Sequence, residues 1–361
     1  MEALLGKTLT ELQEIALSVG LQKFAGKQLA EWLYVRRVTS FDEMTNISLK
    51  GREALKANYT VGRHAPVREA VSKDGTRKYL FAIGEQYIES VYIPEEDRAT
   101  LCVSTQMGCK MGCRFCMTGT LGFHGHLPAA EILNQIFWGM SISPKDDLSV
   151  KRSVSVNGLS GEAGLTNLVF MGEGEPMDNI DEVLRSLEIM TADYACAWSP
   201  KRITVSTVGI PAMKRFLDES ECHLAISMHN PFTAERQEIM PAEKLMSITE
   251  VIAMLKQYDW SHQRRISFEY ICWHGVNDSV RHAKEITRLL KGLNSRVNLI
   301  RFHEGVDHQF PASDEKQMEW FRDYLTANGV TTTIRRSRGE DILAACGMLV
   351  NALSPHADKR R

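Results

Sequence analysis

Three cysteines lie close together in the sequence with a spacing that suits an iron–sulfur cluster. They are Cys109, Cys113 and Cys116, in the pattern C-x3-C-x2-C. Cysteine thiolates are the usual protein ligands of such clusters, and electron carriers commonly use four of them. Three ligands would hold a [4Fe–4S] cluster by three corners and leave the fourth iron open, as a catalytic metal site keeps one position open for substrate. The aromatic Phe115, next to the last ligand, would shield the cluster from water.

Two other uses of close cysteines fit this chain less well. Structural zinc needs four ligands, commonly in two CxxC-like pairs, and no second pair is present. A disulfide framework is not expected in a chain of 361 residues without a recognisable secretory signal. The scattered cysteines are Cys196, Cys222, Cys272 and Cys346.

The composition predicts a large chain with ample core and no membrane span. Of the 361 residues, 43% are hydrophobic, which suits one large domain and one small one. We find no run of about 18 or more apolar residues. We expect no signal peptide, because the first residues lack a basic segment followed by an apolar one. Free cysteines and an oxygen-sensitive cluster together predict a reducing, cytoplasmic location.

The net charge gives no argument for nucleic-acid binding. It is −2 at pH 7, so the chain is not globally basic. Local basic groups could still contact phosphates, although solvated surface is their commoner role. These groups are Arg36–Arg37, Lys201–Arg202, Arg335–Arg336 with Arg338, and Lys359–Arg361.

The residue pattern divides the chain into four segments. Residues 1–60 have apolar positions at helical spacing and predict a small helical accessory module. Residues 61–98 are β-rich, with turn signals at Asp74–Gly75 and Gly84–Glu85, and predict a short antiparallel strand extension. Residues 99–350 form the core domain, and residues 351–361 form a basic tail.

Strands and helices alternate along the core segment, which favours a parallel sheet with helices outside. Six strands are fewer than the eight of a full barrel, so we predict a partial (β/α)6 barrel. Ligands bind at the carboxyl ends of the strands in such sheets. The expected strands are 168–171, 203–206, 223–227, 266–272, 297–302 and 331–335. The expected helices include 178–190, 248–258, 280–291 and 315–328.

A turn rich in glycine and glutamate directly follows the first of these strands. Gly172 and Gly174 permit close backbone approach, and Glu173 or Glu175 would suit a cationic ligand. The plainer interpretation is a tight turn with solvated acids.

Hydroxyl and imidazole groups end two further strands. Ser206, Ser227 and His229 could hydrogen-bond a ribose or a carboxylate. Either serine could instead cap the following helix, which is the commoner role.

Together these features resemble the radical SAM RNA methyltransferases of the RlmN/Cfr family, over nearly the whole chain. The cysteine triplet is typical of the radical SAM superfamily, in which the open iron binds S-adenosylmethionine (SAM). Cys102 and Cys346, in their surroundings, are more specific to the family. The other matching segments are 92–109, the turn 174–176, Asn277–Asp278 and 338–347. The resemblance implies a radical SAM barrel with one [4Fe–4S] cluster on Cys109, Cys113 and Cys116.

The resemblance also implies a mechanism that uses two SAM molecules per turnover. The first methylates Cys346. A deoxyadenosyl radical from the second abstracts hydrogen from that methyl group, and the carbon radical adds to an adenine ring carbon. Cys102 resolves the protein–RNA adduct through a transient disulfide with Cys346, and Glu89 accepts the ring proton. The implied SAM contacts are Gly174, Glu175, Ser206, Ser227, Met228, His229 and His303.

These residue types suit the chemistry. The acceptor carbon is electrophilic, so a radical carried on a methyl thioether replaces polar attack on a SAM methyl group. Thiolate attack on sulfur is a low-barrier release step, and a carboxylate can remove the proton. Without the resemblance, Cys346 would be interpreted as a buried small hydrophobe and Glu89 as a solvent-facing strand residue.

Two positions depart from the family pattern. His303 stands where the family usually has Asn, and Met348 where it often has Gln. Imidazole can still donate and accept hydrogen bonds. The departures leave the chemistry intact and bear on the substrate, as in a divergent branch.

The resemblance predicts methylation of carbon 2 of an adenosine in 23S rRNA, with tRNA as a further candidate substrate. Residues 1–60 and the basic groups would guide the RNA, flavodoxin or ferredoxin would donate electrons, and the protein would be a monomer without membrane contact. Three alternatives stay open. They are methylation of carbon 8, a radical SAM enzyme that modifies a peptide or protein, and a non-enzymatic iron–sulfur regulator.

Overall fold

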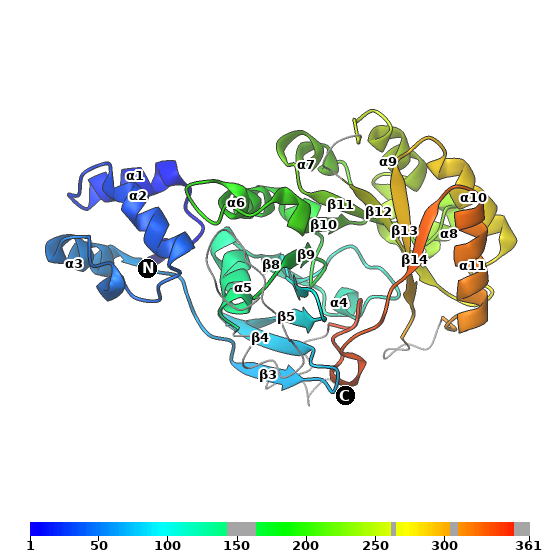
Figure 1. Ribbon diagram of the computed structural model, residues 1–361, viewed down its shortest axis with the longest axis horizontal. Coiled ribbons are helices and arrows are strands. Elements are labelled where there is room, and N and C mark those ends of the chain that lie inside the picture. Colours follow the sequence, from blue (N-terminus) through cyan, green and yellow to red (C-terminus); the bar gives the residue numbers. More distant parts are fainter. Residues whose placement is uncertain (143–163, 261–264, 304–309, 350–361) are drawn as a thin grey trace.

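A ten-stranded sheet forms the centre of the protein in the computed structural model, which describes residues 1–142, 164–260, 265–303 and 310–349 (Figure 1). The predicted basic tail, 351–361, lies outside the described residues. The strand order is β14-β13-β12-β11-β10-β9-β6-β5-β4-β3. The strands from β6 to β14 run parallel, and those from β3 to β6 run antiparallel.

The parallel part contains one strand more than the sequence pattern predicts. The additional strand is β6, which pairs in parallel with β9 and antiparallel with β5. Its four residues directly follow the β-rich extension, so the pattern alone did not separate them from it. The parallel strands are β6 (Ala99–Cys102), β9 (Asn167–Phe170), β10 (Ile203–Thr207), β11 (His223–Ser227), β12 (Ile266–Cys272), β13 (Ser295–Arg301) and β14 (Thr331–Ile334).

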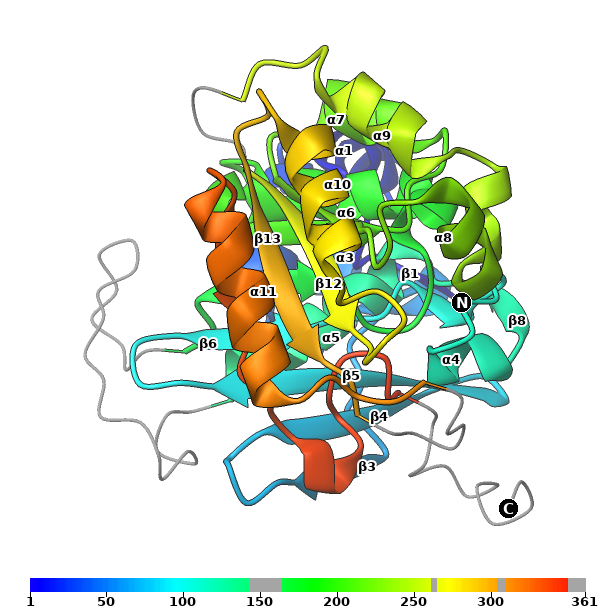
Figure 2. The ribbon, with the colours of Figure 1, turned by 90° about the vertical axis from the view of Figure 1, so that its right-hand side faces the viewer.

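Amphipathic helices cover the parallel strands (Figure 2). Strand β11 shows why the strands must be covered, because its central residues Leu224, Ala225 and Ile226 are completely buried. Helix α9 begins at Ile248 because Ser247 and Glu250 form a capping box. The helices are α4 (Met117–Thr120), α5 (Ala129–Ser141), α6 (Ile180–Thr191), α7 (Met213–Glu219), α8 (Thr233–Ile239), α9 (Ile248–Leu255), α10 (Val280–Leu290) and α11 (Glu315–Ala327). The predicted partial barrel with helices outside is confirmed.

The antiparallel extension consists of β3 (Arg68–Val71), β4 (Arg77–Ile83) and β5 (Gln86–Pro94). Its turns lie at the two predicted positions, where Gly75 and Gly84 adopt positive φ angles of 85° and 60°. A hairpin of β7 (Gln106–Gly108) and β8 (Phe123–His126) brackets the cysteine segment. The extension therefore leads directly into the segment that carries the cysteines.

The N-terminal helices lie at one end of the molecule, and α10 and α11 lie at the other (Figure 1). Helix α1 begins after Thr8, which forms a capping box with Glu11. The side chain of Glu11 also accepts from Arg185 of α6 at 2.7 Å, which joins the module to the barrel. The elements are β1 (Glu2–Ala3), α1 (Leu9–Ser18), α2 (Ala25–Ala30), α3 (Leu49–Asn58) and β2 (Tyr59–Thr60), with short π- and 3-10-helical segments at Glu31–Val35 and Phe41–Glu43.

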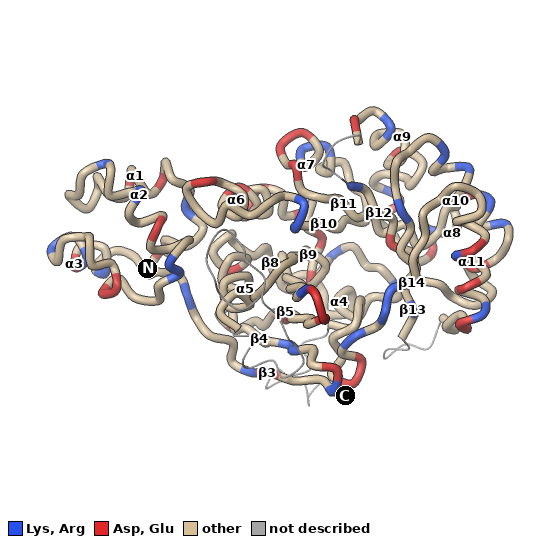
Figure 3. Tube along the Cα trace, viewed as in Figure 1, with Lys and Arg blue, Asp and Glu red and all other residues tan. Residues whose placement is uncertain are grey.

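Charged residues of both signs alternate along the chain (Figure 3). This distribution agrees with the net charge of −2. Among the described helices, none has both the length and the apolar character needed to cross a bilayer.

Candidate active site

A cavity of about 860 Å3, including its open mouth, lies at the carboxyl ends of the parallel strands. Most of the residues proposed from the sequence line it. They are Cys109, Cys113, Cys116, Gly174, Glu175, Ser206, Ser227, His229 and Cys346.

The three cysteines of the triplet share this cavity wall. Burial raises the pKa of each thiol, to about 12 for Cys109, and the charges of Cys109 and Cys116 raise that of Cys113 further. Binding of iron replaces these protons, so loading would release them. No three His, Cys, Asp or Glu side chains of the described ranges converge as a single metal ion requires. Cluster ligands each bind a separate iron, so this donor set fits a cluster better than a zinc ion.

The glycine–glutamate turn packs tightly against the segment that leads from β6 into β7. A Cβ atom on Gly172 would lie 2.7 Å from the Ser104 hydroxyl, and one on Gly174 would lie 2.5 Å from Gln106. Glu173 is buried and accepts hydrogen bonds from the main-chain N–H of Glu89 at 2.8 Å and of Gly108 at 3.4 Å. Burial and the charge of Glu89 raise the pKa of Glu173 to about 8. This acid is therefore not solvated, and it fixes the backbone next to the cysteine segment.

Glu175 is the acid of this turn that faces the cavity. It is 3% exposed, so the alternative of solvated acids is wrong. Its carboxylate accepts from the N–H groups of Met177 at 3.0 Å and Val208 at 2.9 Å. Burial raises its pKa to about 7. A cationic ligand in the cavity would favour the ionised form.

The hydroxyls at the ends of β10 and β11 also face the cavity. Neither Ser206 nor Ser227 caps a helix, since the N-caps of α7 and α8 are Ala212 and Phe232. Both serines line the cavity instead, so the capping alternative is wrong. Met228 differs from them, because its side chain is completely buried in the core.

His229 is held in one neutral form. Its φ of 50° is unusual for a residue with a side chain. Its Nδ1 accepts from the N–H of Ile271 at 3.1 Å, and its carbonyl accepts from Asn277 at 2.7 Å. Burial, assisted by Arg236, lowers its pKa to about 3. With Nδ1 as acceptor, the neutral ring carries its proton on Nε2 and offers a donor.

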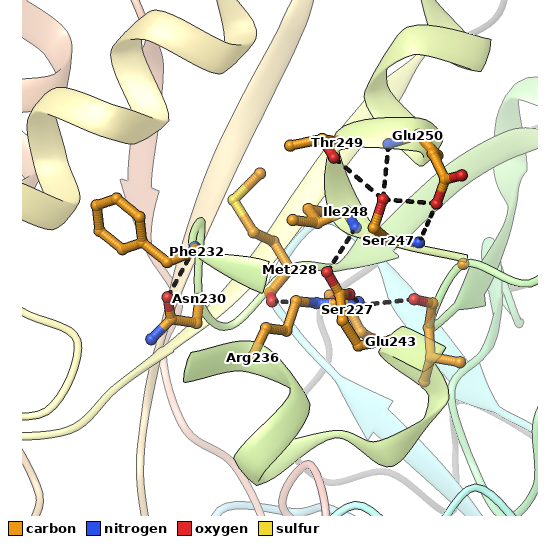
Figure 4. Close-up of polar contacts among 12 residues, drawn as sticks. Ser227, Met228, Asn230, Phe232, Arg236, Glu243, Ser247, Ile248, Thr249 and Glu250 are labelled. Atoms are coloured by element: carbon orange, nitrogen blue, oxygen red, sulfur yellow. Dashed lines mark hydrogen bonds and ion pairs between the residues drawn. The ribbon is translucent and has the colours of Figure 1, made fainter. Parts of the chain in front are cut away.

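A buried arginine holds the ends of β10 and β11 together (Figure 4). Arg236 of α8 is completely buried, and its guanidinium pairs with Glu243. Glu243 in turn accepts from the N–H of Ile248, the first residue of α9, at 2.9 Å. Arg236 also donates to the carbonyls of Met228 at 2.8 Å, Val208 at 2.6 Å and Ser227 at 2.7 Å. One cation thus sets the spacing of the strand ends that line the cavity.

Arg236→Met is expected to lower the free energy of unfolding by about 3–5 kcal/mol, because it leaves the carboxylate of Glu243 buried without its partner. Urea denaturation monitored by circular dichroism would measure this change. The matched control is Arg288→Met, which breaks an exposed pair with Glu285 on α10 and should leave the urea midpoint nearly unchanged. Equal urea midpoints for the two variants would contradict the proposal that Arg236 holds the ends of β10 and β11 together.

Cys346 lies on the cavity wall, in the loop that follows β14. Its side chain is exposed, so the alternative of a buried hydrophobe is wrong. Desolvation by the surrounding protein raises the pKa of the Cys346 thiol, and the charge of Arg335 lowers it. A main-chain hydrogen bond from the N–H of Met117 to the Gly347 carbonyl (2.9 Å) joins the loop to the cysteine segment.

Cys102 ends β6, outside the residues that line the cavity. It packs against a small buried cluster formed by Val91 of β5 with Ala344 and Leu349 of the Cys346 loop. Burial and the charge of Cys346 raise its pKa to about 12. Both thiols are free. The fold therefore places the two cysteines, 244 positions apart in the numbering 102 to 346, on neighbouring segments.

Glu89 lies on β5 and is completely buried, so the alternative of a solvent-facing position is wrong. Its Oε1 lies 3.0 Å from the ammonium of Lys78, which is also completely buried. Sequence reasoning did not identify Lys78, because a lysine on a short strand is usually solvated.

His303 and Met348 line a second, smaller pocket, which shares Cys346 and Phe115 with the main cavity. The His303 ring interacts with Ser337 and lies 3.6 Å from Glu340. Met348 packs against Met117 and Ala345. His303 thus lies beside the Cys346 loop and Met348 belongs to it, and neither residue lines the main cavity.

Arg335 is a further cavity residue, which the sequence analysis named only as part of a basic group that could contact phosphates. It lies 3.7 Å from Glu269, which also lines the cavity. The charge of Glu269 raises the pKa of Arg335. The charge of Arg335 in turn lowers the pKa values of the Cys102 and Cys346 thiols. The basic group 335–338 is therefore partly an element of the site.

Comparison with known proteins gives the family of this chain. Residues 3–61 match the family model described as the ribosomal RNA large subunit methyltransferase N-terminal domain. The chain is 57% identical to the probable dual-specificity RNA methyltransferase RlmN of Phocaeicola vulgatus, over 97% of this chain and 95% of that protein. It is 38% identical to the dual-specificity RNA methyltransferase RlmN of Geobacter sulfurreducens, over 97% and 93% of the two chains. The chain belongs to the RlmN family.

A solved structure supports the RlmN assignment at the level of the whole fold. A radical SAM methyltransferase from Sphaerobacter thermophilus superposes with a TM-score of 0.87 at 34% identity, over 97% of this chain and 99% of the other. The predicted family and the predicted enzyme class, a radical SAM methyltransferase, are confirmed.

Proposed function

We propose that this RlmN-family protein methylates carbon 2 of an adenosine in 23S rRNA, and that tRNA is a second substrate. The observation that supports it best is the position of Cys346, an exposed thiol on the wall that also carries Cys109, Cys113 and Cys116. A sulfur there can accept a methyl group within the cavity where a radical would form. The relatives named dual-specificity RNA methyltransferases support an RNA substrate.

We propose that the three cysteines of the triplet hold one [4Fe–4S] cluster, which would supply the electron that cleaves SAM into methionine and a deoxyadenosyl radical. Glu175, Ser206, Ser227 and His229, with the backbone at Gly174, would bind SAM. Glu175 would pair with its ammonium, and the Nε2–H of His229 would donate to one of its oxygens. Met228 would contribute only through its main chain, and His303 through the second pocket.

The remaining steps belong to two thiols and one carboxylate. Cys346 accepts the methyl group and carries that carbon to the adenine. Glu89 accepts the proton that leaves the ring carbon, and the unpaired electron of the adduct would return to the cluster. Cys102 then attacks the Cys346 sulfur as a thiolate, so that a sulfur–sulfur bond forms as the sulfur–carbon bond breaks. The electron pair of the broken bond stays on the carbon, which takes up a proton to become the methyl group, and a cellular thiol reduces the disulfide for the next turnover. Two SAM molecules are used per turnover, one for its methyl group and one for the radical.

RNA, an electron donor and a reducing compartment complete the proposal. The module 1–60 and the basic groups would hold folded RNA by its shape and backbone, while the target base is unstacked into the cavity mouth. Flavodoxin or ferredoxin would reduce the cluster of a monomeric, cytoplasmic enzyme.

Arg335→Met should slow methylation of Cys346 at neutral pH and shift its rate profile to higher pH. The sign follows from the arginine charge, which lowers the pKa of the Cys346 thiol, so its loss leaves less thiolate at a given pH. Methyl transfer from labelled SAM to the protein, at saturating SAM between pH 7 and 10, measures the profile. The exposed neighbour Arg336→Met is the control and should keep the wild-type profile. Identical profiles for both variants would contradict the role of Arg335.

The position of methylation decides between the leading function and its relatives. Anaerobic incubation of the reconstituted protein with SAM, a reductant and 23S rRNA or tRNA, followed by nucleoside mass spectrometry, should give 2-methyladenosine. 8-methyladenosine would indicate the carbon-8 alternative. A modified peptide in place of RNA would indicate a protein-modifying enzyme, and absence of SAM consumption would indicate a regulator.

A further inference from the structure

A buried lysine joins two residues to which the proposed function gives separate tasks. The ammonium of Lys78 lies 3.0 Å from Oε1 of Glu89 and donates to the carbonyl of Leu343 at 3.1 Å. Leu343 precedes Cys346 by three positions and begins the tight part of its loop, with a φ of 53°. The proton acceptor and the loop of the methyl-carrying thiol therefore share one cation.

The strand register explains why Lys78 and Glu89 lie next to each other. Lys78 on β4 pairs directly with Val91 on β5, and Val91 pairs directly with Cys102 on β6. Residues directly opposite each other on neighbouring strands face the same side of a sheet. Glu89 precedes Val91 by two positions and so faces that side too. One face of the extension thus carries Lys78, Glu89 and Cys102 in adjacent positions.

The Cys346 loop covers this face. Ala344 and Leu349 pack on Val91, and both ribbon views place the red C-terminal segment beside β3 and β4 (Figures 1 and 2). A second attachment lies nearer to solvent, where the carboxylate of the exposed Asp341 accepts from the Ser72 hydroxyl at 2.5 Å. The bond between Ser72 and Asp341 holds the same loop through residues other than Lys78 and Glu89.

We propose that Lys78 is a positioning residue for the proton-removal step, whose ammonium holds the carboxylate of Glu89 against the main chain of the Cys346 loop. This inference rests on the proposed function of Glu89 and Cys346. An isolated charge without solvent is strongly disfavoured, so the buried ammonium of Lys78, 3.0 Å from Oε1, compensates the carboxylate that is to accept the proton. Glu173 is a further charged group next to Glu89, since its carboxylate accepts from the main-chain N–H of Glu89 at 2.8 Å.

The bond from Lys78 to the Cys346 loop does not depend on the charge of Glu89. When Glu89 accepts the ring proton, its charge is lost and Lys78 keeps the Leu343 carbonyl as an acceptor. The loop therefore stays attached while Cys102 attacks the Cys346 sulfur. One side chain thus holds both the proton acceptor and the loop in place for the two steps.

The test uses the reconstituted full chain with labelled SAM and RNA, and measures Cys346 methylation and protein–RNA adduct release separately. Lys78→Met should methylate Cys346 within about twofold of wild type and form the adduct. It should release the adduct about 100-fold more slowly at pH 7, the size of a general-base contribution. Release should recover at higher pH, where Glu89 ionises without its partner. Lys78→Arg, which keeps the charge, should restore most of the release rate.

Two controls separate positioning from folding. Asp341→Asn weakens the other attachment of the same loop and should leave the pH profile of release unchanged. Lys78→Met/Glu89→Gln removes both charges and should regain the stability that Lys78→Met loses, without regaining release.

Release by Lys78→Met with the wild-type rate and pH profile would overturn the inference, as would equal loss of Cys346 methylation and release. If wild type itself neither methylates Cys346 nor forms an adduct, the proposed function fails instead, and the two failures are thereby distinguished.

Discussion

Cys346→Ala should reduce RNA methylation to the level of a reaction without enzyme, and no label from SAM should remain on the protein. The reason is that Cys346 is the proposed carrier of the transferred carbon, and an alanine side chain cannot accept a methyl group from SAM. Scintillation counting of RNA and protein fractions after incubation with methyl-labelled SAM measures both losses. The cluster should survive, because its three proposed ligands are unchanged.

Cys196→Ala is the matched control for this experiment. Cys196 lies near the N-terminal module, where its sulfur contacts the carbonyl of Tyr34 at 3.7 Å. Its loss should leave methylation within about twofold of wild type, as for a substitution away from the reacting groups. A Cys346→Ala enzyme that still methylates RNA would exclude the carrier mechanism and favour a different radical reaction.

Cys102→Ala should trap the reaction one step later, as a covalent complex of protein and RNA. Methylation of Cys346 and attack on adenine do not require Cys102, whereas release requires a second thiol. The expected yield is at most one RNA per chain and no free product. A denaturing gel with labelled RNA would show the slow band, and Cys346→Ala should abolish it.

The trapped complex also tests the role of Glu89. A Glu89→Gln enzyme should accumulate the same band, because the ring proton cannot leave. If Cys102→Ala released methylated RNA at the wild-type rate, with no band, the pairing of Cys102 and Cys346 would be contradicted.

Local features of the sequence predicted much of this site. The spacing of Cys109, Cys113 and Cys116 is a property of eight consecutive residues, so it could be recognised without the fold. The turn Gly172–Glu175 and the strand-end serines follow directly after strands that their own pattern indicates. Because parallel strands place their carboxyl ends at one edge, these short patterns sufficed to predict a common cavity.

Features that depend on distant partners were not predicted. Arg236 reaches carbonyls at the ends of two strands, and Lys78 meets a carbonyl 265 positions later. A single sequence gives no signal for such pairs, and a charged residue is by default assigned to the surface. The strand β6 was missed for a related reason, since its role depends on pairing with β9.

The side-chain environments also required the fold. Glu89, Glu173 and Glu175 are all buried, although composition alone favours solvated glutamates. The resemblance to a family indicated Glu89, but only the strand register shows why it lies beside the Cys346 loop. The structure likewise limits the proposed role of Met228 to a main-chain contact with SAM, because its side chain is buried in the core.

Electron paramagnetic resonance of the anaerobically reconstituted and reduced protein, with and without SAM, tests the central claim most directly. The account predicts one [4Fe–4S]+ signal per chain that changes when SAM binds to the open iron, and that is lost when Cys109, Cys113 or Cys116 is replaced by alanine. A cluster coordinated by four thiolates, a signal that SAM leaves unchanged, or the absence of a cluster would contradict it.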